Sequence, residues 1–328
     1  MLAATLDDLK VLDLSQGLAG PICAKILADF GADVIKVEPP AGDTARRMAP
    51  HAGNEAHPEK SLIYLLANLN KRGIRLDLEK PEGRELLRRL AHASDVIVES
   101  FVPGFLASIG LDYATLAQEN PRLVMVSITP FGQTGPYRHF QSEEIVTYAL
   151  SGIMSISGTS DREPLKHGGM QSQYEGGLCG SVGALAAIYA RDFCGEGQQV
   201  DISLQDVIAS TLIVHQPMYS WTGAVQGRRR PGGAQYGHVQ RCKDGYFIWQ
   251  TGGGDPSTGG RRPPRASTID RALRHPRPPV LESGLDKVRG GPEGHNLGGH
   301  ERPSGVRDRD RAHVRELQRV DPSAEPRT

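Results

Sequence analysis

The chain has 328 residues, and its 38 Lys and Arg side chains are matched by 38 Asp and Glu. Because a chain without net charge has no global field to attract nucleic acid or anionic lipid, neither is expected as a partner. No apolar run reaches the roughly 18 residues of a bilayer-spanning helix, and residues 1–10 do not resemble a secretory signal. The four cysteines form no metal-binding or disulfide pattern, which indicates a cytoplasmic protein without a metal site.

Strand-like and helix-like patterns alternate along residues 10–221. Short apolar or alternating runs predict strands over residues 10–15, 33–38, 73–78, 95–99, 123–128 and 199–204. Helical spacing predicts helices over residues 22–30, 81–93, 174–191 and 205–221. Strands interleaved with helices of this length indicate an α/β protein with a parallel sheet covered on both faces. We therefore assign residues 1–221 to a Rossmann-like large domain.

The composition changes after this domain. Residues 222–254 begin a linker or small domain, with a turn signal at Asp244-Gly245. Residues 255–328 contain no aromatic residue but fourteen Arg and ten Pro. So few apolar side chains cannot offset the backbone entropy lost on ordering, about 1–2 kcal/mol per residue, so we expect a disordered tail. A frame-shifted or truncated end after about residue 254 is our hypothesis; a basic nucleic-acid arm is the alternative, although acidic residues are interspersed with its arginines.

The turn after the first strand invites comparison with dinucleotide-binding proteins. Gly17 and Gly20 lie at the wrong spacing for that fingerprint, and its third glycine is absent. The following helix N-terminus could instead receive a phosphate through its free amides, or Gly17 could serve only the turn.

Two further segments have both a structural and a functional interpretation. The adjacent carboxylates Glu143 and Glu144 precede an apolar helical run, where they would complement the helix dipole or supply an acid near a site. Gly176 and Gly177 follow a polar segment, and would form either a ligand-binding loop or a turn. The sequence contains no Walker A loop, no Gly-x-Ser-x-Gly and no H-E-x-x-H motif.

Six segments, in one order along the chain, carry a family resemblance. They read VLDLSQGLAGPICAKILADFGADVIKVEPPAGDTAR, NKRGIRLDLEKPEGRELLRRL, SDVIVESFVPGFLASIGLDY, NPRLVMVSITPFGQTGPY, EIVTYALSGIM and GEGQQVDISLQDV. Over residues 6–252 the chain resembles the class III CoA-transferase family, which includes formyl-CoA and carnitine CoA-transferases and α-methylacyl-CoA racemases. The resemblance implies a CoA-binding large domain and an interlocked homodimer. It further implies a smaller second domain, which is incomplete or absent here, and a role in cytoplasmic fatty acid metabolism.

The resemblance also implies catalytic positions. In the transferases an aspartate attacks the acyl thioester and passes through an anhydride and an aspartyl-CoA thioester. Gln173 occupies the matching position, and a neutral carboxamide can only hold a substrate by hydrogen bonds. Glu144 matches a second active-site acid of the transferases, and Glu143 matches a histidine of the racemases. Glu175 is expected to face elsewhere, since it lies about 200° further round a helix.

Other positions match the CoA-binding residues of the family. They are Gln16, Leu18, Ala19, Leu76, Asp77, Ser100, Phe101, Val102, Ser108, Lys71 and Arg72. Ser100 stands where the family has asparagine, Ser108 replaces an arginine, and Glu79 stands where lysine is usual. Arg46 is a further cation that could face the CoA phosphates.

The first hypothesis is CoA transfer between an acyl-CoA and a carboxylic acid, with CoA as substrate and no metal. The first alternative is an acyl-CoA racemase-like enzyme. The second is an inactive acyl-CoA-binding or dimerisation partner of an aspartate-bearing relative. A truncated product without function is the third.

Overall fold

The computed structural model of the protein describes residues 5–228 and 238–249. The chain divides into two compact units, Met1–Gln235 and Tyr236–Thr328. The first unit therefore extends past residue 221, where the sequence analysis ended the large domain. The tail over residues 255–328, and the truncation hypothesis that concerns it, lie outside the described residues.

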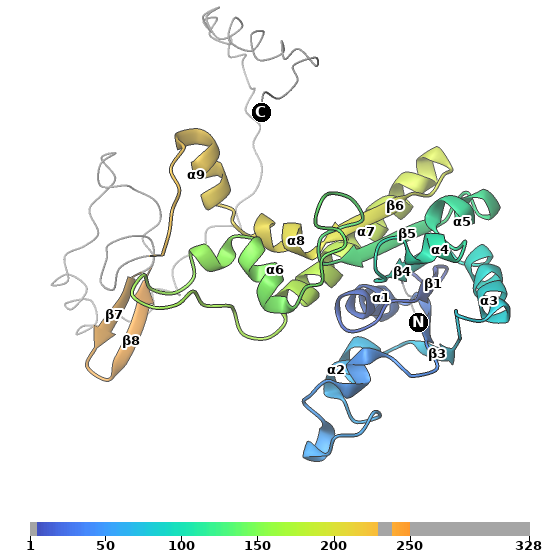
Figure 1. The fold of residues 1–328 in the computed structure, drawn as a ribbon, viewed down its shortest axis with the longest axis horizontal. Helices are drawn as coiled ribbons and strands as arrows, with labels where there is room; N and C mark the ends of the chain where they lie inside the picture. Colours follow the sequence, from blue (N-terminus) through green and yellow to red (C-terminus); the bar gives the residue numbers. More distant parts are fainter. Residues whose placement is uncertain (1–4, 229–237, 250–328) are drawn as a thin grey trace, which may run out of the picture. The chain divides into compact units, whose positions relative to one another are not determined.

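Six parallel strands form the sheet of the first unit, in the order β3-β2-β1-β4-β5-β6 (Figure 1). They are β1 (Lys10–Asp13), β2 (Asp33–Glu38), β3 (Arg72–Arg75), β4 (Val96–Glu99), β5 (Val124–Thr129) and β6 (Gln199–Ser203). The predicted α/β fold with a parallel sheet is confirmed. Because the strand order reverses between β1 and β4, the sheet has a topological switch point there, as in dinucleotide-binding folds.

Helices connect the strands. They are α1 (Ala19–Asp29), α2 (Leu62–Ala67), α3 (Pro81–His92), α4 (Phe105–Ser108), α5 (Tyr113–Glu119), α6 (Glu144–Leu150), α7 (Gln171–Cys194), α8 (Leu204–Ser210) and α9 (His215–Thr222). Short 3-10 turns occupy η1 (Thr44–Arg47), η2 (Ala52–Asn54) and η3 (Ile153–Ser155). The single helix predicted over residues 205–221 is wrong, because α8 ends at Ser210 and α9 begins at His215. Pro217 explains the break: in a continuous helix its ring would clash with the carbonyl of Ile213.

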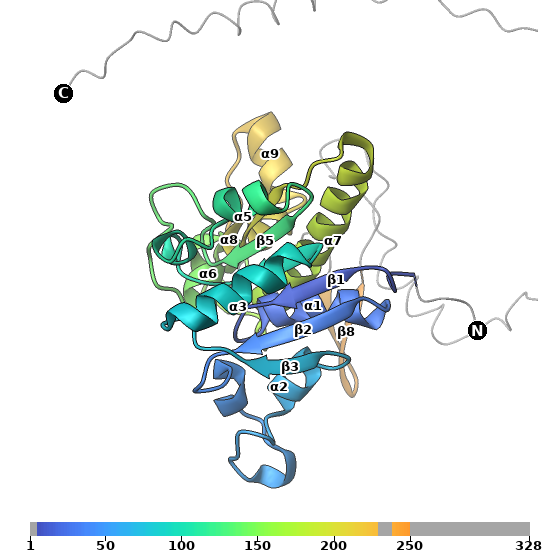
Figure 2. The ribbon, with the colours of Figure 1, turned by 90° about the vertical axis from the view of Figure 1, so that its right-hand side faces the viewer.

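The strands bury one set of side chains on each face of the sheet. Val11, Val96 and Val124 pack with α1 and α7, whereas Leu12 and Ile97 pack with α3 and α5. Figure 2 shows α3 lying across one face of the strands, with α1 and α7 behind them. Strands buried on both faces explain the nearly continuous apolar runs in the sequence.

Glycines let α7 approach its neighbours closely. A Cβ atom on Gly177 would lie 2.6 Å from the Ala19 carbonyl oxygen, and one on Gly183 would lie 2.8 Å from Val200 Cγ1. Gly176 and Gly177 therefore lie inside α7 and serve packing, whereas the sequence analysis expected a loop or turn. The start of α7 is consequently held in a fixed position over α1.

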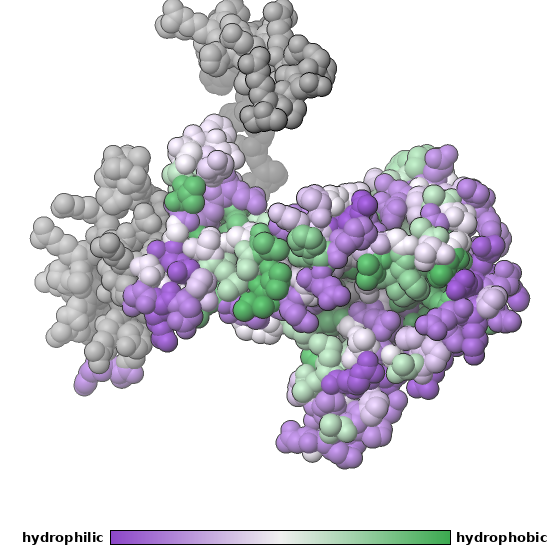
Figure 3. Space-filling model, in the orientation of Figure 1, coloured by the Kyte–Doolittle hydropathy of each residue, from purple (hydrophilic) through white to green (hydrophobic). Residues whose placement is uncertain are grey.

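One face of α7 remains apolar and exposed. Its side chains recur every three or four residues and are 37–77% exposed: Leu178, Val182, Leu185, Tyr189 and Phe193. We call these residues the α7 stripe. Apolar residues of α6 also reach the surface, and Figure 3 shows green patches around that helix. A contiguous exposed apolar surface of this kind is typical of an interaction site.

In the second unit, β7 (His238–Cys242) and β8 (Gly245–Trp249) form an antiparallel hairpin. Its turn at Lys243 and Asp244 is at the position that the turn signal predicted. Among the described residues of both units, no helix is long and apolar enough to cross a membrane.

Candidate functional site

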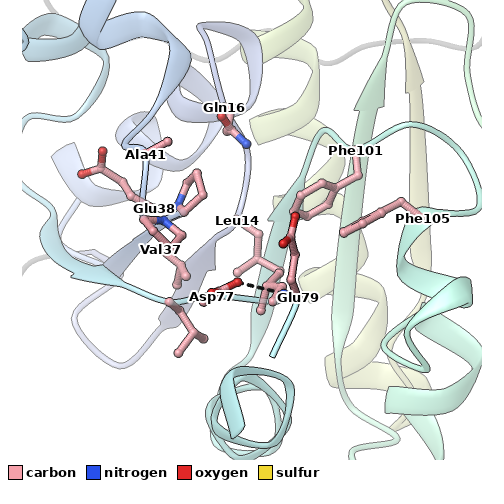
Figure 4. Close-up of a pocket in the computed structure, with 13 residues that line it drawn as sticks. Leu14, Gln16, Val37, Glu38, Ala41, Asp77, Glu79, Phe101 and Phe105 are labelled. Atoms are coloured by element: carbon pink, nitrogen blue, oxygen red, sulfur yellow. Dashed lines mark hydrogen bonds between the residues drawn. The ribbon is translucent and has the colours of Figure 1, made fainter. Parts of the chain in front are cut away.

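A pocket of about 460 Å³ opens at the switch point, beside the carboxyl ends of β1, β2 and β4. We call it the switch-point pocket. Its lining is mostly apolar and comprises Leu14, Gln16, Val37, Glu38, Pro39, Pro40, Ala41, Leu76, Asp77, Leu78, Glu79, Phe101 and Phe105. Figure 4 shows the rings of Phe101 and Phe105 on one side of the pocket, with Val37 and Ala41 on the other. Ligands of open α/β sheets bind at such switch points.

Hydrogen bonds connect two of the segments that line this pocket. The Leu14 N–H donates to the Val98 carbonyl oxygen at 2.8 Å, and the Gln16 N–H donates to Ser100 Oγ at 3.0 Å. The loop after β1 is thereby tied to the loop after β4. Gln16 and Phe101, both expected CoA-binding residues, are brought to the same pocket.

Lys71, expected to face CoA, belongs instead to a buried ion network. Its Nζ lies 2.8 Å from Asp13 Oδ2, 2.7 Å from the Pro21 carbonyl oxygen and 3.0 Å from Asn68 Oδ1. All three ammonium hydrogens therefore have acceptors inside the protein. Burial lowers the pKa of Lys71, although the charge of Asp13 opposes this shift. The Lys71 charge is not available to a ligand phosphate in this arrangement.

The same network fixes the loop between β1 and α1. Lys36 Nζ lies 2.8 Å from Asp43 Oδ2 and 3.6 Å from Asp13 Oδ2. Asp43 Oδ1 accepts the N–H of Gly17 at 2.9 Å, and Gly17 has a φ of +77°, which glycine adopts without strain. Burial raises the pKa of Asp13, but the charges of Lys36 and Lys71 outweigh it and hold that pKa below its usual value. Gly17 therefore serves the turn.

Arg46 is also engaged within the protein. Its Nε and Nη2 donate to the Glu38 carboxylate at 2.6 and 2.7 Å, and its Nη1 donates to Glu59 at 2.8 Å. The Tyr64 hydroxyl donates to Glu38 at 2.8 Å, and the Asp43 N–H donates to it at 2.8 Å. Burial raises the pKa of Glu38, but these donors outweigh it and lower the pKa to about 2. Glu38 therefore lines the pocket as a carboxylate, and both of its oxygens already accept hydrogen bonds from the protein.

Two other expected phosphate-binding positions lie outside the switch-point pocket. Arg72 is exposed, and its guanidinium pairs with Asp33 through contacts of 2.6 and 2.7 Å. Ser108 is exposed at the end of α4, and its hydroxyl donates to the Phe105 carbonyl oxygen at 2.7 Å. Neither side chain lines the pocket, although Ser108 is hydrogen-bonded to the backbone of Phe105, which does.

Leu18 and Ala19 are almost fully buried, with 2% and 4% of their surface exposed. Leu18 packs with Ile22 and Ala67, and Tyr174 of α7 touches the same cluster. These two residues pack between the starts of α1 and α7, and they do not line the pocket.

A second pocket, of about 510 Å³, lies beyond the ends of β4 and β5. We call it the β4–β5 pocket. It is lined by Ser100, Phe101, Val102, Pro103, Thr129, Pro130, Arg138, His139, Phe140, Gln141, Ser142, Glu143 and Val146. Phe101 lines both pockets, so the two are adjacent. Glu143 and Val102, both sequence candidates, reach this second pocket.

Gln173 lies in the first turn of α7 and is half-buried. Within the described residues its side-chain amide makes no hydrogen bond. Glu144, on α6, accepts the Ser172 N–H at 2.9 Å and also the Ser172 hydroxyl. Because the first amides of a helix lack partners within it, Glu144 acts as the acceptor that holds the start of α7. The Glu144 carboxylate is therefore beside Gln173 but already engaged.

Glu175, two residues after Gln173, is partly buried and lies within the electrostatic influence of Glu144. Burial raises the pKa of Glu175, the charge of Glu144 raises it further, and His167 opposes the shift. Burial also raises the pKa of Tyr148 to about 12, with contributions from Glu175 and Glu144. Two carboxylates that influence each other, Glu144 on α6 and Glu175 on α7, therefore accompany the uncharged amide of Gln173 at this end of α7. Among the described residues, no group of His, Cys, Asp and Glu could hold a metal ion.

The comparisons with known proteins agree with this architecture. Residues 6–258 match CoA-transferase family III. The chain belongs to this family. The succinyl-CoA:(R)-benzylsuccinate CoA-transferase subunit BbsE of Thauera aromatica is 37% identical over 240 residues, which make up 73% of this chain and 58% of the relative. The succinate–glutarate CoA-transferase of Agrobacterium fabrum is 38% identical over 253 residues, or 75% of this chain and 63% of the relative.

A family III crystal structure shows the same fold. The CAIB/BAIF family protein of Brucella suis has a TM-score of 0.67 and 37% identity, covering 75% of this chain and 66% of that one. The chain thus spans less than two thirds of the length of these relatives.

Proposed function

We propose that this chain binds acyl-CoA and takes part in the transfer of CoA between dicarboxylic acids. The observation that carries the proposal is the pair of adjacent pockets that meet at Phe101, beside the switch point of a family III sheet. Similar proteins are named for succinyl-CoA:(R)-benzylsuccinate, succinate–glutarate and acetyl-CoA:oxalate CoA transfer. Succinate, benzylsuccinate, glutarate and oxalate each carry two carboxylates, whereas acetate, the acid of the acetyl donor, carries one. A cytoplasmic location and a role in fatty acid metabolism stay predictions from the resemblance.

In this proposal the adenosine end of CoA enters the switch-point pocket. An apolar pocket with two aromatic rings suits a flat heterocycle, and Gln16 and Asp77 offer hydrogen-bonding groups at its edge. The pantetheine arm then passes Ser100, Phe101 and Val102 toward the β4–β5 pocket. Leu76 contributes apolar contact to the ligand, whereas Leu18 and Ala19 only pack beneath the loop and do not touch the ligand. Lys71, Arg72 and Ser108 keep the positions described above and do not bind phosphate.

Gln173 determines what chemistry the chain performs by itself. A carboxamide is not a nucleophile at neutral pH, so we propose that Gln173 holds the acyl group by hydrogen bonds and forms no anhydride. Glu144 is engaged by Ser172, so it does not substitute for the missing carboxylate. Glu143 lines the neighbouring pocket, and a racemase-like role for it is untested.

A second candidate function is a binding subunit that works beside an aspartate-bearing chain. The α7 stripe favours it, because five apolar side chains are exposed on the helix that begins at the active-site position. Two relatives are named as subunits, BbsE of Thauera aromatica and the beta subunit of a succinyl-CoA–L-malate CoA-transferase of Chloroflexus aurantiacus. We propose that the stripe contacts a second family III chain, either an identical copy or the aspartate-bearing one.

The experiment that tests the role of Gln173 is a trapping assay on the full chain. Wild type, Gln173→Asp and the control Gln171→Asp are incubated with succinyl-CoA and hydroxylamine, and covalent products are detected by mass spectrometry. Gln171 lies in the same helical turn, but its amide already donates to Gly168. We expect tight thioester binding by all three proteins and a covalent product only with Gln173→Asp. A covalent product with wild type would show that another side chain is the nucleophile.

A native-mass measurement tests the α7 stripe. Val182→Glu places a charge in the middle of the stripe, and we expect it to abolish the assembled species that wild type forms. Arg89→Glu, on the exposed side of α3, is the matched surface control. If both variants assemble as wild type does, the stripe is not an interface.

A further inference from the structure

The loop over residues 131–140 has a defined shape. Phe131 packs against Tyr137 and Phe140 with ring centroids 6.2 and 6.4 Å apart, and the Tyr137 and Phe140 rings are 5.1 Å apart. Asp201, on β6, accepts the Gln133 N–H at 2.9 Å. The two residues between Tyr137 and Phe140 are therefore presented by a braced loop.

Arg138 is one of these two residues, and it lines the β4–β5 pocket. Its Nε donates to Nε2 of His139 at 2.9 Å. Among the residues that the structure describes, its two terminal nitrogens have no partner and no carboxylate pairs with it. A guanidinium whose outer nitrogens are free presents the fork that binds a carboxylate with two parallel hydrogen bonds. This contrasts with Arg46 and Arg72, whose forks are occupied by Glu38 and Asp33.

Thr129 supplies a second, independent observation. It lies at the end of β5, only 2% of its surface is exposed, and it lines the same pocket. Its hydroxyl oxygen has no hydrogen-bond partner within the described part of the chain. Buried hydroxyls are normally hydrogen-bonded, so the partner of this one is a group outside the described chain, either water or a ligand.

We propose that the β4–β5 pocket is a carboxylate site, in which Arg138 binds both oxygens of an organic acid and Thr129 donates one hydrogen bond to it. The identification of the acid rests on the proposed function: it is the second carboxylate of a dicarboxylic acid, the one that does not bear CoA. Apolar contacts from Phe101, Phe140 and Val146 surround the carbon chain. Arg138 is then the residue that selects the CoA thioesters of diacids over those of monoacids of equal length.

Glu143 lines the same pocket and carries the opposite charge. A carboxylate ligand gains attraction from Arg138 and meets repulsion from Glu143, so the two residues have opposite effects on the affinity for an anion. Removal of the Arg138 charge should therefore weaken the binding of a carboxylate, and removal of the Glu143 charge should strengthen it.

The test is calorimetric titration of the full chain with succinate and with butyrate, which differ by one carboxylate, and with the matching CoA thioesters. We expect wild type to bind both free acids, because each offers Arg138 one carboxylate. It should bind succinyl-CoA about 10- to 100-fold more tightly than butyryl-CoA, because only succinyl-CoA keeps a free carboxylate for a charge-assisted pair. Arg138→Gln should remove most of this preference, and Arg89→Gln should leave it intact. Glu143→Gln should strengthen the binding of both acids.

Thr129→Val separates a binding role from a structural one. Because the hydroxyl has no partner in the described protein, we expect this near-isosteric change to leave thermal stability unchanged or raised, yet to weaken succinate several-fold. Lower stability with unchanged succinate affinity would show that the hydroxyl serves the fold.

Parallel titrations with succinyl-CoA and butyryl-CoA distinguish a failure of the carboxylate site from a failure of the proposed function. If both thioesters bind but neither their affinities nor those of the free acids depend on Arg138, the carboxylate site is wrong and the proposed function stands. If neither thioester binds while succinate still binds through Arg138, the carboxylate site stands and the proposed function is wrong.

Discussion

Replacement of Glu38 by Gln tests whether the ion pair beside the switch-point pocket stabilises the fold. The change keeps the size of the side chain and removes only its charge, which Arg46, Tyr64 and the Asp43 N–H all contact. In the folded protein the pKa of Glu38 falls from its usual 4.5 to about 2. A depression of this size corresponds to about 3 kcal/mol of stability at neutral pH. We expect Glu38→Gln to lose about that amount at pH 7.

The dependence on pH provides the sharper check. A carboxylate with a depressed pKa stabilises the protein fully above about pH 4.5, and the stabilisation is lost as the pH falls toward about 2. Urea unfolding of wild type and Glu38→Gln at pH 7, 4 and 3, followed by circular dichroism, should therefore give a difference that shrinks with falling pH. Below pH 2, where the Glu38 carboxyl is protonated in the folded protein as well, the difference between the two proteins should vanish.

A matched control uses the pair between Glu55 and Lys60, whose side chains are 65% and 40% exposed. Glu55→Gln should change the free energy of unfolding by less than about 0.5 kcal/mol, because solvent screens exposed pairs. A loss for Glu38→Gln as small as that of the control, or one that does not vary with pH, would refute the electrostatic reasoning.

Three further outcomes follow from the described contacts. Lys71→Met leaves Asp13 with less compensation for its buried charge, so urea unfolding should show a loss of about 3–5 kcal/mol; a loss below 1 kcal/mol contradicts the network's importance. Gly177→Ala forces α7 away from α1, so we expect the free energy of unfolding, measured by urea titration, to fall by about 1–2 kcal/mol; an unchanged value would mean that the helices can separate without cost. Burial raises the pKa of the Cys23 thiol, so a thiol reagent should label exposed Cys179 and spare Cys23 until the protein unfolds.

The layered fold was predictable because its signals are local. The apolar runs that became β1, β2, β4, β5 and β6 are short, lie between glycine or polar residues, and alternate with helical spacing. The error at α8 and α9 has a local cause too: the apolar periodicity continues to Trp221, but Pro217 prevents one continuous helix. The effect of that proline could have been anticipated from the sequence.

The candidate site was harder to predict because its charges are paired over long separations. Asp13 ends β1, whereas Lys71 lies just before β3, 58 residues later in the chain. Nothing near Lys71 in the sequence indicates that its ammonium group pairs with a buried carboxylate. Arg138 escaped notice for the opposite reason. It stands in an aperiodic polar segment, and only the three-dimensional arrangement shows that its fork is free.

The position of Phe101 has a geometric consequence for any molecule that fills both pockets. Phe101 lines both the switch-point pocket and the β4–β5 pocket, so a molecule that fills both must bend around this residue. Its two ends then lie on opposite sides of Phe101. A smaller side chain at this place would merge the two cavities into a single wider trough, in which a long flexible ligand could slide along its own length. Under the proposed function, Phe101 marks the boundary between the heterocyclic end and the acid end of the ligand.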